Sequence, residues 1–135
     1  MDDKLRRFYL ESQVNNASPG QRLIMLYDGL IQQAERADSE ISSPEHANDP
    51  SLASLATSRC IDIMTELNRA LNFEADPGLC ARLSSLYRFF AREFSEAFDK
   101  RQPAKIRAIL PLIRDLRNTW VEADRQANRF QAVAA

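Results

Sequence analysis

Apolar residues recur at steps of three and four along four separate stretches of this chain, and this spacing restricts the fold more than any other feature of the sequence. The stripes comprise Leu23, Tyr27, Leu30, Ala34, Ala37 and Ile41; Ala56, Cys60, Ile63, Leu67 and Ala70; Leu79, Leu83, Leu86, Phe90, Phe94 and Ala97; and Ile106, Ile109, Ile113, Leu116, Trp120, Ala123 and Ala127. Such steps place side chains on one face of an α-helix. Helix-length stripes with short connections predict an all-α fold, an antiparallel four-helix bundle with a short N-terminal arm or helix.

Capping residues mark where these helices begin. Ser18 and Gln21 form a capping box around Pro19, which suits the first helical position because its missing N–H would have no partner there. Asp76 is expected to cap the third helix, with Pro77 as its first residue. The other two helices are expected to begin near Asp49 to Ser51 and at Pro103.

Pro111 interrupts the fourth stripe. It removes one backbone N–H and presses on the carbonyl of Arg107, which predicts a kink near residues 107–111. A separate short turn over Pro103 to Ala108 is the alternative. The stripe keeps its phase across Pro111, which favours one kinked helix.

The chain has 135 residues, a usual length for one domain, and the periodic part spans residues 18–130. Residues 1–17 precede the first capping box and are predicted to form an arm. The arm is rich in apolar residues, and such a terminus is usually fixed to the rest of its domain. We expect it to lie over an apolar groove in the free protein and to be displaced by a partner. Its apolar members are Leu5, Phe8, Tyr9, Leu10 and Val14.

Charge and hydropathy bound the choice of partner and compartment. The formal net charge is −1, from 18 basic and 19 acidic residues, whereas nucleic-acid binding requires a basic excess or a basic face. The opening residues lack the apolar core of a signal peptide, and no apolar run has the length of a transmembrane helix. We therefore expect a cytoplasmic protein that neither binds nucleic acid nor inserts into a membrane.

No residue pattern points to catalysis or to a bound cofactor or metal. The one histidine, His46, lies in a polar connection, and Cys60 and Cys80 lack metal-ligand spacing, as expected for buried thiols. Phosphate-binding loops need glycines, and the chain has three in total. Acidic pairs such as Asp62 with Glu66 are expected on solvated helix faces. An enzyme is not expected.

The helices carry more apolar residues than one core face of a bundle helix requires. Between Leu23 and Ile31, seven of nine residues are apolar, counting Tyr27. Either the first helix is central and buries the excess, or a groove stays open for partner helices. The second alternative gives as candidate partner-binding residues Tyr9, Val14, Leu26, Tyr27, Leu30, Ile31, Ile61, Met64, Leu71, Leu86, Tyr87 and Phe90.

Several segments resemble the FliS family of flagellin-specific export chaperones. They are Tyr9, residues 14–19 (VNNASP), residues 23–29 (LIMLYDG), residues 66–72 (ELNRALN), residues 83–89 (LSSLYRF) and residues 116–120 (LRNTW). The resemblance implies a four-helix bundle that binds the disordered C-terminal segment of flagellin in the cytosol. It also implies that binding prevents premature polymerisation and presents flagellin to the flagellar type III export apparatus. Tyr9 falls where the family carries a tyrosine in its N-terminal arm.

Other functions remain open at this point. The bundle could be a non-catalytic subunit that self-associates through the same apolar surface, with a weak homodimer as its simplest form. It could also be a chaperone paralogue for another filament protein. A bundle enzyme or metal carrier is the third class, and it predicts bound metal in the purified protein.

Overall fold

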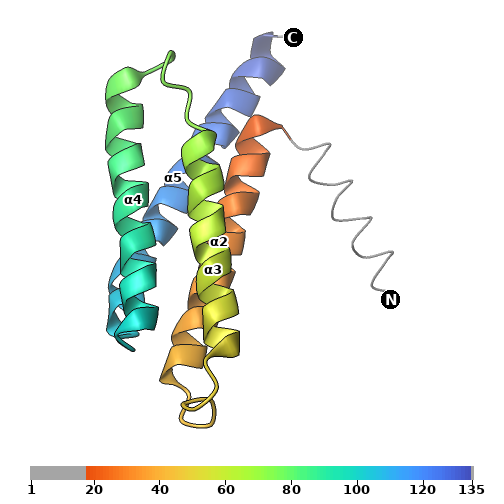
Figure 1. The fold of residues 1–135 in the computed structure, drawn as a ribbon. Helices are drawn as coiled ribbons and strands as arrows, with labels where there is room; N and C mark the ends of the chain where they lie inside the picture. Colours follow the sequence, from red (N-terminus) through yellow and green to blue (C-terminus); the bar gives the residue numbers. More distant parts are fainter. Residues whose placement is uncertain (1–17, 135) are drawn as a thin grey trace.

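The structure is a computed structural model that describes the backbone of residues 18–134 and the side chains of residues 18–127. The predicted arm of residues 1–17, with Tyr9 and Val14, lies outside the described residues. Within the described part there are four helices and no strand (Figure 1). They are α2 (Pro19–Ser42), α3 (Ser51–Arg69), α4 (Pro77–Asp99) and α5 (Ala104–Ala134). The predicted all-α fold, an antiparallel four-helix bundle, is confirmed.

The caps lie where the sequence places them. The Ser18 hydroxyl accepts a bond from the Gln21 N–H at 3.2 Å, and the Gln21 side chain accepts one from the Ser18 N–H at 3.1 Å. The Asp76 carboxylate accepts a bond from the Leu79 N–H at 3.1 Å. These bonds satisfy N–H groups that a helix start leaves without an intrahelical partner. The starts of α2 and α4 are therefore fixed by local sequence.

Pro111 lies inside a single helix, because α5 runs without a break from Ala104 to Ala134. The alternative of a separate turn over Pro103 to Ala108 is therefore wrong. Ile109 and Ile113, on either side of the proline, are both buried, so the apolar stripe keeps its phase across it. The kink itself stays a prediction.

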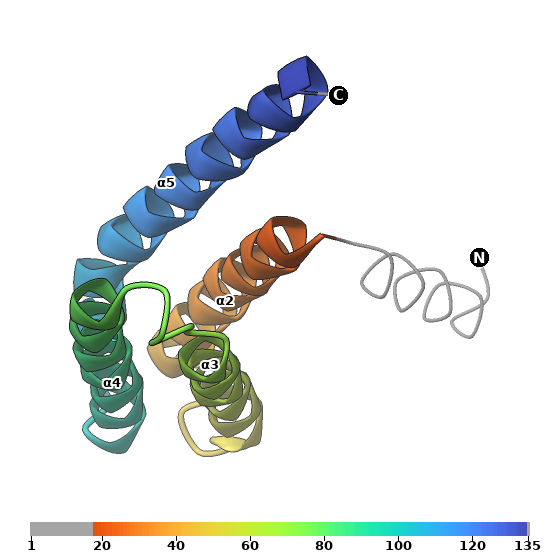
Figure 2. The ribbon, with the colours of Figure 1, turned by 90° about the horizontal axis from the view of Figure 1, so that it is seen from above.

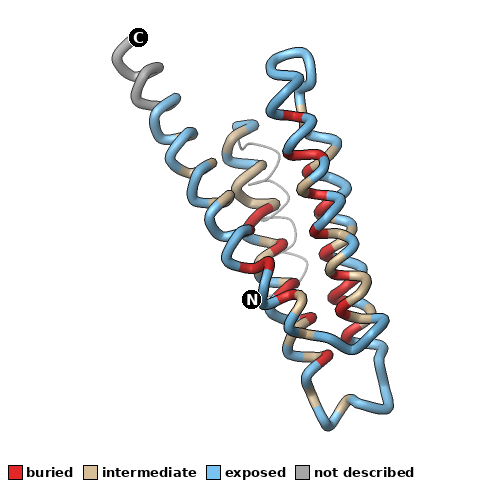
Figure 3. The backbone as a smooth tube through the Cα atoms, turned by 90° about the vertical axis from the view of Figure 1, so that its left-hand side faces the viewer, coloured by how far each residue is buried: buried red, intermediate tan, exposed pale blue. Residues whose placement is uncertain are grey.

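The core follows the first predicted stripe closely and the next two less closely. All of that stripe except half-buried Leu23 is buried, from Tyr27 to Ile41. In α3 Met64 is buried, whereas Ile63 is half-buried and Ala70 is exposed; in α4 Tyr87 is buried and Leu79 is exposed. The core faces of α3 and α4 are thus rotated slightly from the predicted stripes, and the buried residues lie along the inner sides of the helices (Figure 3).

The apolar stripe of α5 continues beyond the part that the bundle buries. Its residues are buried as far as Ile113, then Leu116 and Trp120 are half-buried, and Ala123 and Ala127 are exposed. Viewed from above, the C-terminal half of α5 runs away from α4 while it stays beside the start of α2 (Figure 2). One end of the bundle is therefore open between α4 and α5.

Ion pairs explain which neighbour α5 follows. Arg117 contacts Asp28 at 2.8 Å and Arg107 contacts Asp38 at 3.0 Å, and Arg114 pairs with Glu35, so three guanidinium groups attach α5 to α2. Each exposed pair contributes little alone, but all three lie on the side of α5 that faces α2. Among the described residues, the ion pairs between α5 and α4 belong to Lys105, which bridges Glu93 and Glu96 at the opposite end.

At the end of the bundle that carries Lys105, the loop after α4 contacts the loop between α2 and α3. Arg101 follows α4 in a left-handed backbone conformation, with φ of 52°, at the position where a helix commonly ends on glycine. Its guanidinium donates to the carbonyl of Ala47 in the α2–α3 loop at 2.8 Å. The two loops are thus joined at one end of the bundle, and the groove opens at the other.

Candidate partner-binding groove

An open groove with a volume of about 890 Å³ lies at the end of the bundle where α5 leaves α4. It is formed by the first turns of α2 and α4, the last turn of α3 with the loop that follows it, and the C-terminal half of α5. Because neighbouring helices run antiparallel, the starts of α2 and α4 lie at the same end of the bundle as the ends of α3 and α5. Its large apolar lining residues are Leu23, Leu26, Leu67, Leu71, Leu79, Leu83, Tyr87 and Trp120.

Charged residues of both signs surround this apolar lining. Arg22 and Arg69 supply two guanidinium groups, whereas Glu66, Asp76 and Asp124 supply three carboxylates. Large aliphatic and aromatic walls with a mixed polar rim are typical of grooves that accept an amphipathic polypeptide. The groove is thus suited to a peptide rather than to a strongly charged small molecule.

Gly20 permits the close approach of α5 to the start of α2. A Cβ added at this glycine would lie 2.3 Å from Asp124 Oδ1 and 3.1 Å from its Cγ. Real Cβ contacts are never so short, so any other residue would push the Asp124 side chain aside. The glycine therefore leaves room for the Asp124 carboxylate beside the start of α2.

Three polar aromatic side chains form a hydrogen-bonded group in the wall of the groove. The Tyr27 and Tyr87 hydroxyls lie 2.6 Å apart, and the Trp120 indole N–H donates to the Tyr27 hydroxyl over 3.3 Å. Both tyrosines are buried, with exposed fractions of 0% and 1%, although Tyr87 lines the groove. This group joins α2, α4 and α5 at the point where the groove begins.

Burial keeps both phenols protonated. Loss of solvent raises the pKa of Tyr87, and its bond with Tyr27 raises it further. Burial also raises the pKa of Tyr27, although bonds from Tyr87 and Trp120 partly oppose that rise. The Cys60 thiol is also fully buried, and loss of solvent raises its pKa to about 12.

These shifts predict a loss of stability in alkali. The unfolded chain releases protons near the ordinary pKa values, 9.0 for a thiol and 10.0 for a phenol, while the folded chain retains them. Stability is therefore fully present below those values and falls as pH rises past them, by about 1.4 kcal/mol per pH unit for each retained proton. Urea unfolding at increasing pH measures the slope. Tyr87→Phe should give a shallower slope, and equal slopes would contradict the assignment.

The predicted partner-binding residues divide into three groups. Five of the twelve are buried in the bundle, five are half-buried, and two, Tyr9 and Val14, lie outside the described residues. The buried five are Tyr27, Leu30, Met64, Tyr87 and Phe90. The half-buried residues, all packed against the core, are Leu26, Ile31, Ile61, Leu71 and Leu86. Of all these, the groove brings together Leu26, Leu71 and Tyr87.

The other large apolar residues of the groove belong to the stripes that were predicted to form the core. These are Leu23, Leu67, Leu79, Leu83 and Trp120. Their positions near the ends of the helices could have predicted that they lie together in one groove. In an antiparallel bundle the starts of the first and third helices meet the ends of the second and fourth, so these residues gather at one end.

His46 and the two cysteines show no arrangement for catalysis or metal binding. His46 Nδ1 lies 2.6 Å from Glu40 Oε2, and both cysteines are free and buried. Within the described residues, no cluster of three or more histidine, cysteine, aspartate or glutamate side chains is arranged to hold a metal ion. No helix among them has the length and hydropathy to cross a membrane.

Comparison with known proteins gives a family match over nearly the whole chain. The family model described as flagellar protein FliS matches residues 1–127. The flagellar secretion chaperone FliS of Vibrio cholerae is 24% identical over 115 residues, which cover 85% of this chain and 82% of that protein. The flagellar secretion chaperone FliS of Bacillus subtilis is 26% identical over 117 residues, with the same shares covered.

Proposed function

Because the chain belongs to the FliS family of flagellar proteins, we propose that it is a cytoplasmic export chaperone that binds the disordered C-terminal segment of flagellin. Membership of this family supports an export chaperone role. In this proposal the bound segment becomes helical in the groove and is withheld from premature polymerisation. The complex then delivers flagellin to the flagellar type III export apparatus.

The observation that carries this proposal is that the C-terminal half of the apolar stripe on α5 is only partly buried by the bundle. Leu116 and Trp120 are half-buried and Ala123 is exposed, although all three continue the phase of buried Ile113. An apolar stripe of this kind is normally covered by a neighbouring helix, and this half of α5 runs away from α4 (Figure 2). A guest helix of amphipathic sequence would complete the packing.

The energetics favour a guest that covers several residues. Each large apolar side chain that becomes buried contributes roughly 1.5–3 kcal/mol. A disordered segment must offset at least about 2–5 kcal/mol of ordering cost when it folds on binding. Four leucines that line the groove are not fully buried, namely Leu23, Leu26, Leu71 and Leu79, which makes a long amphipathic segment a better ligand than a short one.

Binding of a synthetic flagellin C-terminal peptide tests the proposal. Isothermal titration should give a 1:1 complex, and circular dichroism should show more helix in the mixture than in the two components apart. The absence of binding at tens of micromolar peptide would contradict it. Light scattering on the chaperone alone distinguishes the alternative of self-association, which predicts dimers or larger species and no effect of the peptide.

The N-terminal residues are expected to compete with the flagellin peptide for the groove, and the same binding experiment can test this. We propose that the arm of residues 1–17, with Tyr9 and Val14, covers part of this apolar surface until flagellin displaces it. A chain that lacks residues 1–15 should then bind the peptide more tightly and bind more of an apolar dye. If deletion changes neither, the arm does not compete.

A further inference from the structure

The exposed face of α4 carries positive charge that forms no ion pair within the fold. Between Gly78 and Arg92 the charged residues are Arg82, Arg88 and Arg92, and there is no aspartate or glutamate. All three arginines are exposed, and within the described residues none of them pairs with a carboxylate. By contrast, every lysine and arginine of α5 up to residue 127 forms an ion pair. The guanidinium groups of α4 are therefore available to a partner.

The carboxylates at the two ends of this stretch have other partners. Asp76 accepts a backbone N–H as the cap of the helix. Glu93 and Glu96 lie 3.4 and 3.0 Å from the Lys105 ammonium group. The bond from Lys105 is the largest cause of the lowered pKa of Glu96, and the charge of Arg92 is the smallest. The fold thus supplies no close carboxylate to the arginines.

An exposed aromatic ring lies among these arginines. Phe89 is 36% exposed, and the Arg92 guanidinium carbon lies 5.8 Å from the centroid of its ring. Arg82, Phe89 and Arg92 follow one another at steps of seven and three, so they share one face of the helix. Arg88 donates to the Ser84 hydroxyl at 3.1 Å, which holds its side chain in place and leaves most of its N–H donors available. The surface combines several carboxylate-binding groups with one apolar contact.

We propose that this surface binds an acidic segment of a second partner protein, with carboxylates on Arg88 and Arg92 and an apolar side chain on Phe89. Guanidinium groups bind carboxylates through two parallel N–H bonds. Segments that attach to anionic membranes carry about four to eight cations, more than this surface offers. Nucleic acid requires a larger basic excess than a chain of net charge −1 provides. A polypeptide is thus the partner that fits.

This surface is separate from the groove that is proposed to bind flagellin. From α4 the groove is lined by Leu79, Cys80, Leu83 and Tyr87, and none of the arginines of α4 is among its lining residues. Both sites can therefore be occupied at once, and a chaperone with a guest in its groove can still be recognised through α4.

A fluorescent synthetic peptide in which glutamates surround one phenylalanine tests the proposal on the full chain. It should bind, and added salt should weaken the complex. Arg88→Glu combined with Arg92→Glu should lower the affinity at least about tenfold. Arg36→Glu combined with Arg59→Glu is the matched control, because it makes the same charge change at exposed arginines that also lack ion pairs. Equal losses in the two double variants would assign binding to net charge and overturn the proposal.

The same assay tests the aromatic contact and the class of partner. Phe89→Ala keeps the charges and should weaken the peptide complex about threefold, whereas an unchanged affinity would exclude the ring from the site. A peptide with glutamines in place of the glutamates should not bind. Binding to phosphatidylserine vesicles without binding to the acidic peptide would assign the surface to lipid and contradict the proposal. Displacement of the probe by a flagellin C-terminal peptide would place it in the groove and would also contradict it.

Discussion

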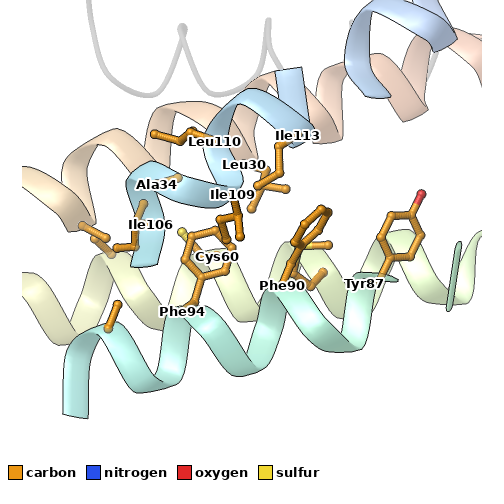
Figure 4. Close-up of a cluster of buried hydrophobic side chains, with 14 of the residues drawn as sticks. Leu30, Ala34, Cys60, Tyr87, Phe90, Phe94, Ile106, Ile109, Leu110 and Ile113 are labelled. Carbon is orange, nitrogen blue, oxygen red and sulfur yellow. The ribbon is translucent and has the colours of Figure 1, made fainter. Parts of the chain in front are cut away.

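Replacing Phe90 with alanine is expected to lower the free energy of unfolding by about 3–5 kcal/mol. The Phe90 ring is fully buried and lies between α4 and the isoleucines of α5 (Figure 4). Its removal leaves a cavity that the well-packed surroundings fill only in part, and this adds to the lost apolar burial. Urea unfolding followed by circular dichroism measures the change.

Phe89 provides the matched control for this experiment. It is the neighbouring residue of the same helix, with its ring centroid 6.0 Å from that of Phe90, but 36% of it is exposed. Its outward contact is with the Arg92 guanidinium, 5.8 Å from the ring centroid. Phe89→Ala should cost no more than about 1 kcal/mol. Equal losses for the two variants would contradict the described core.

Replacing Ala123 with tryptophan is expected to weaken binding of the flagellin peptide at least about tenfold. Ala123 is exposed and lines the groove from α5, so an indole at this position occupies space that the guest requires. The loss of one apolar anchor, roughly 1.5–3 kcal/mol, accounts for this factor. Because the position is exposed in the free chain, the variant should fold normally, as its circular dichroism and thermal unfolding will show.

Gln126→Trp is the control for the steric explanation. Gln126 is exposed on the same helix and does not line the groove, so an indole there adds the same surface without filling the site. This variant should bind the peptide like the unmodified chain. If both tryptophan variants lose affinity equally, general disturbance of α5 explains the loss and the groove does not.

Local patterns in the sequence were sufficient to predict the four helices. The capping box of Ser18 and Gln21 and the cap at Asp76 depend on residues within one turn, so they can be recognised without tertiary structure. The stripe from Tyr27 to Ile41 also required no tertiary information, because α2 buries a single well-defined face. The family resemblance was equally visible in short segments.

The groove depends on contacts between residues far apart in the sequence, and the spacing of apolar residues does not predict such contacts. Trp120 and Ile113 belong to one stripe, yet Ile113 is buried and Trp120 lines the groove because α5 follows α2 and leaves α4 between them. The ion pairs that select this path join residues far apart in the chain, such as Asp28 and Arg117. Likewise, the bond between Tyr27 and Tyr87 connects residues whose pairing no local pattern indicates.

The contact between Gly20 and Asp124 has a consequence for natural variation in this lineage. The first position has room for no methyl group while the second carries a carboxylate at this distance. A homologue that retained the aspartate and replaced the glycine would have to turn its carboxylate away from the start of the first helix, which would change the charge presented at the rim of the groove.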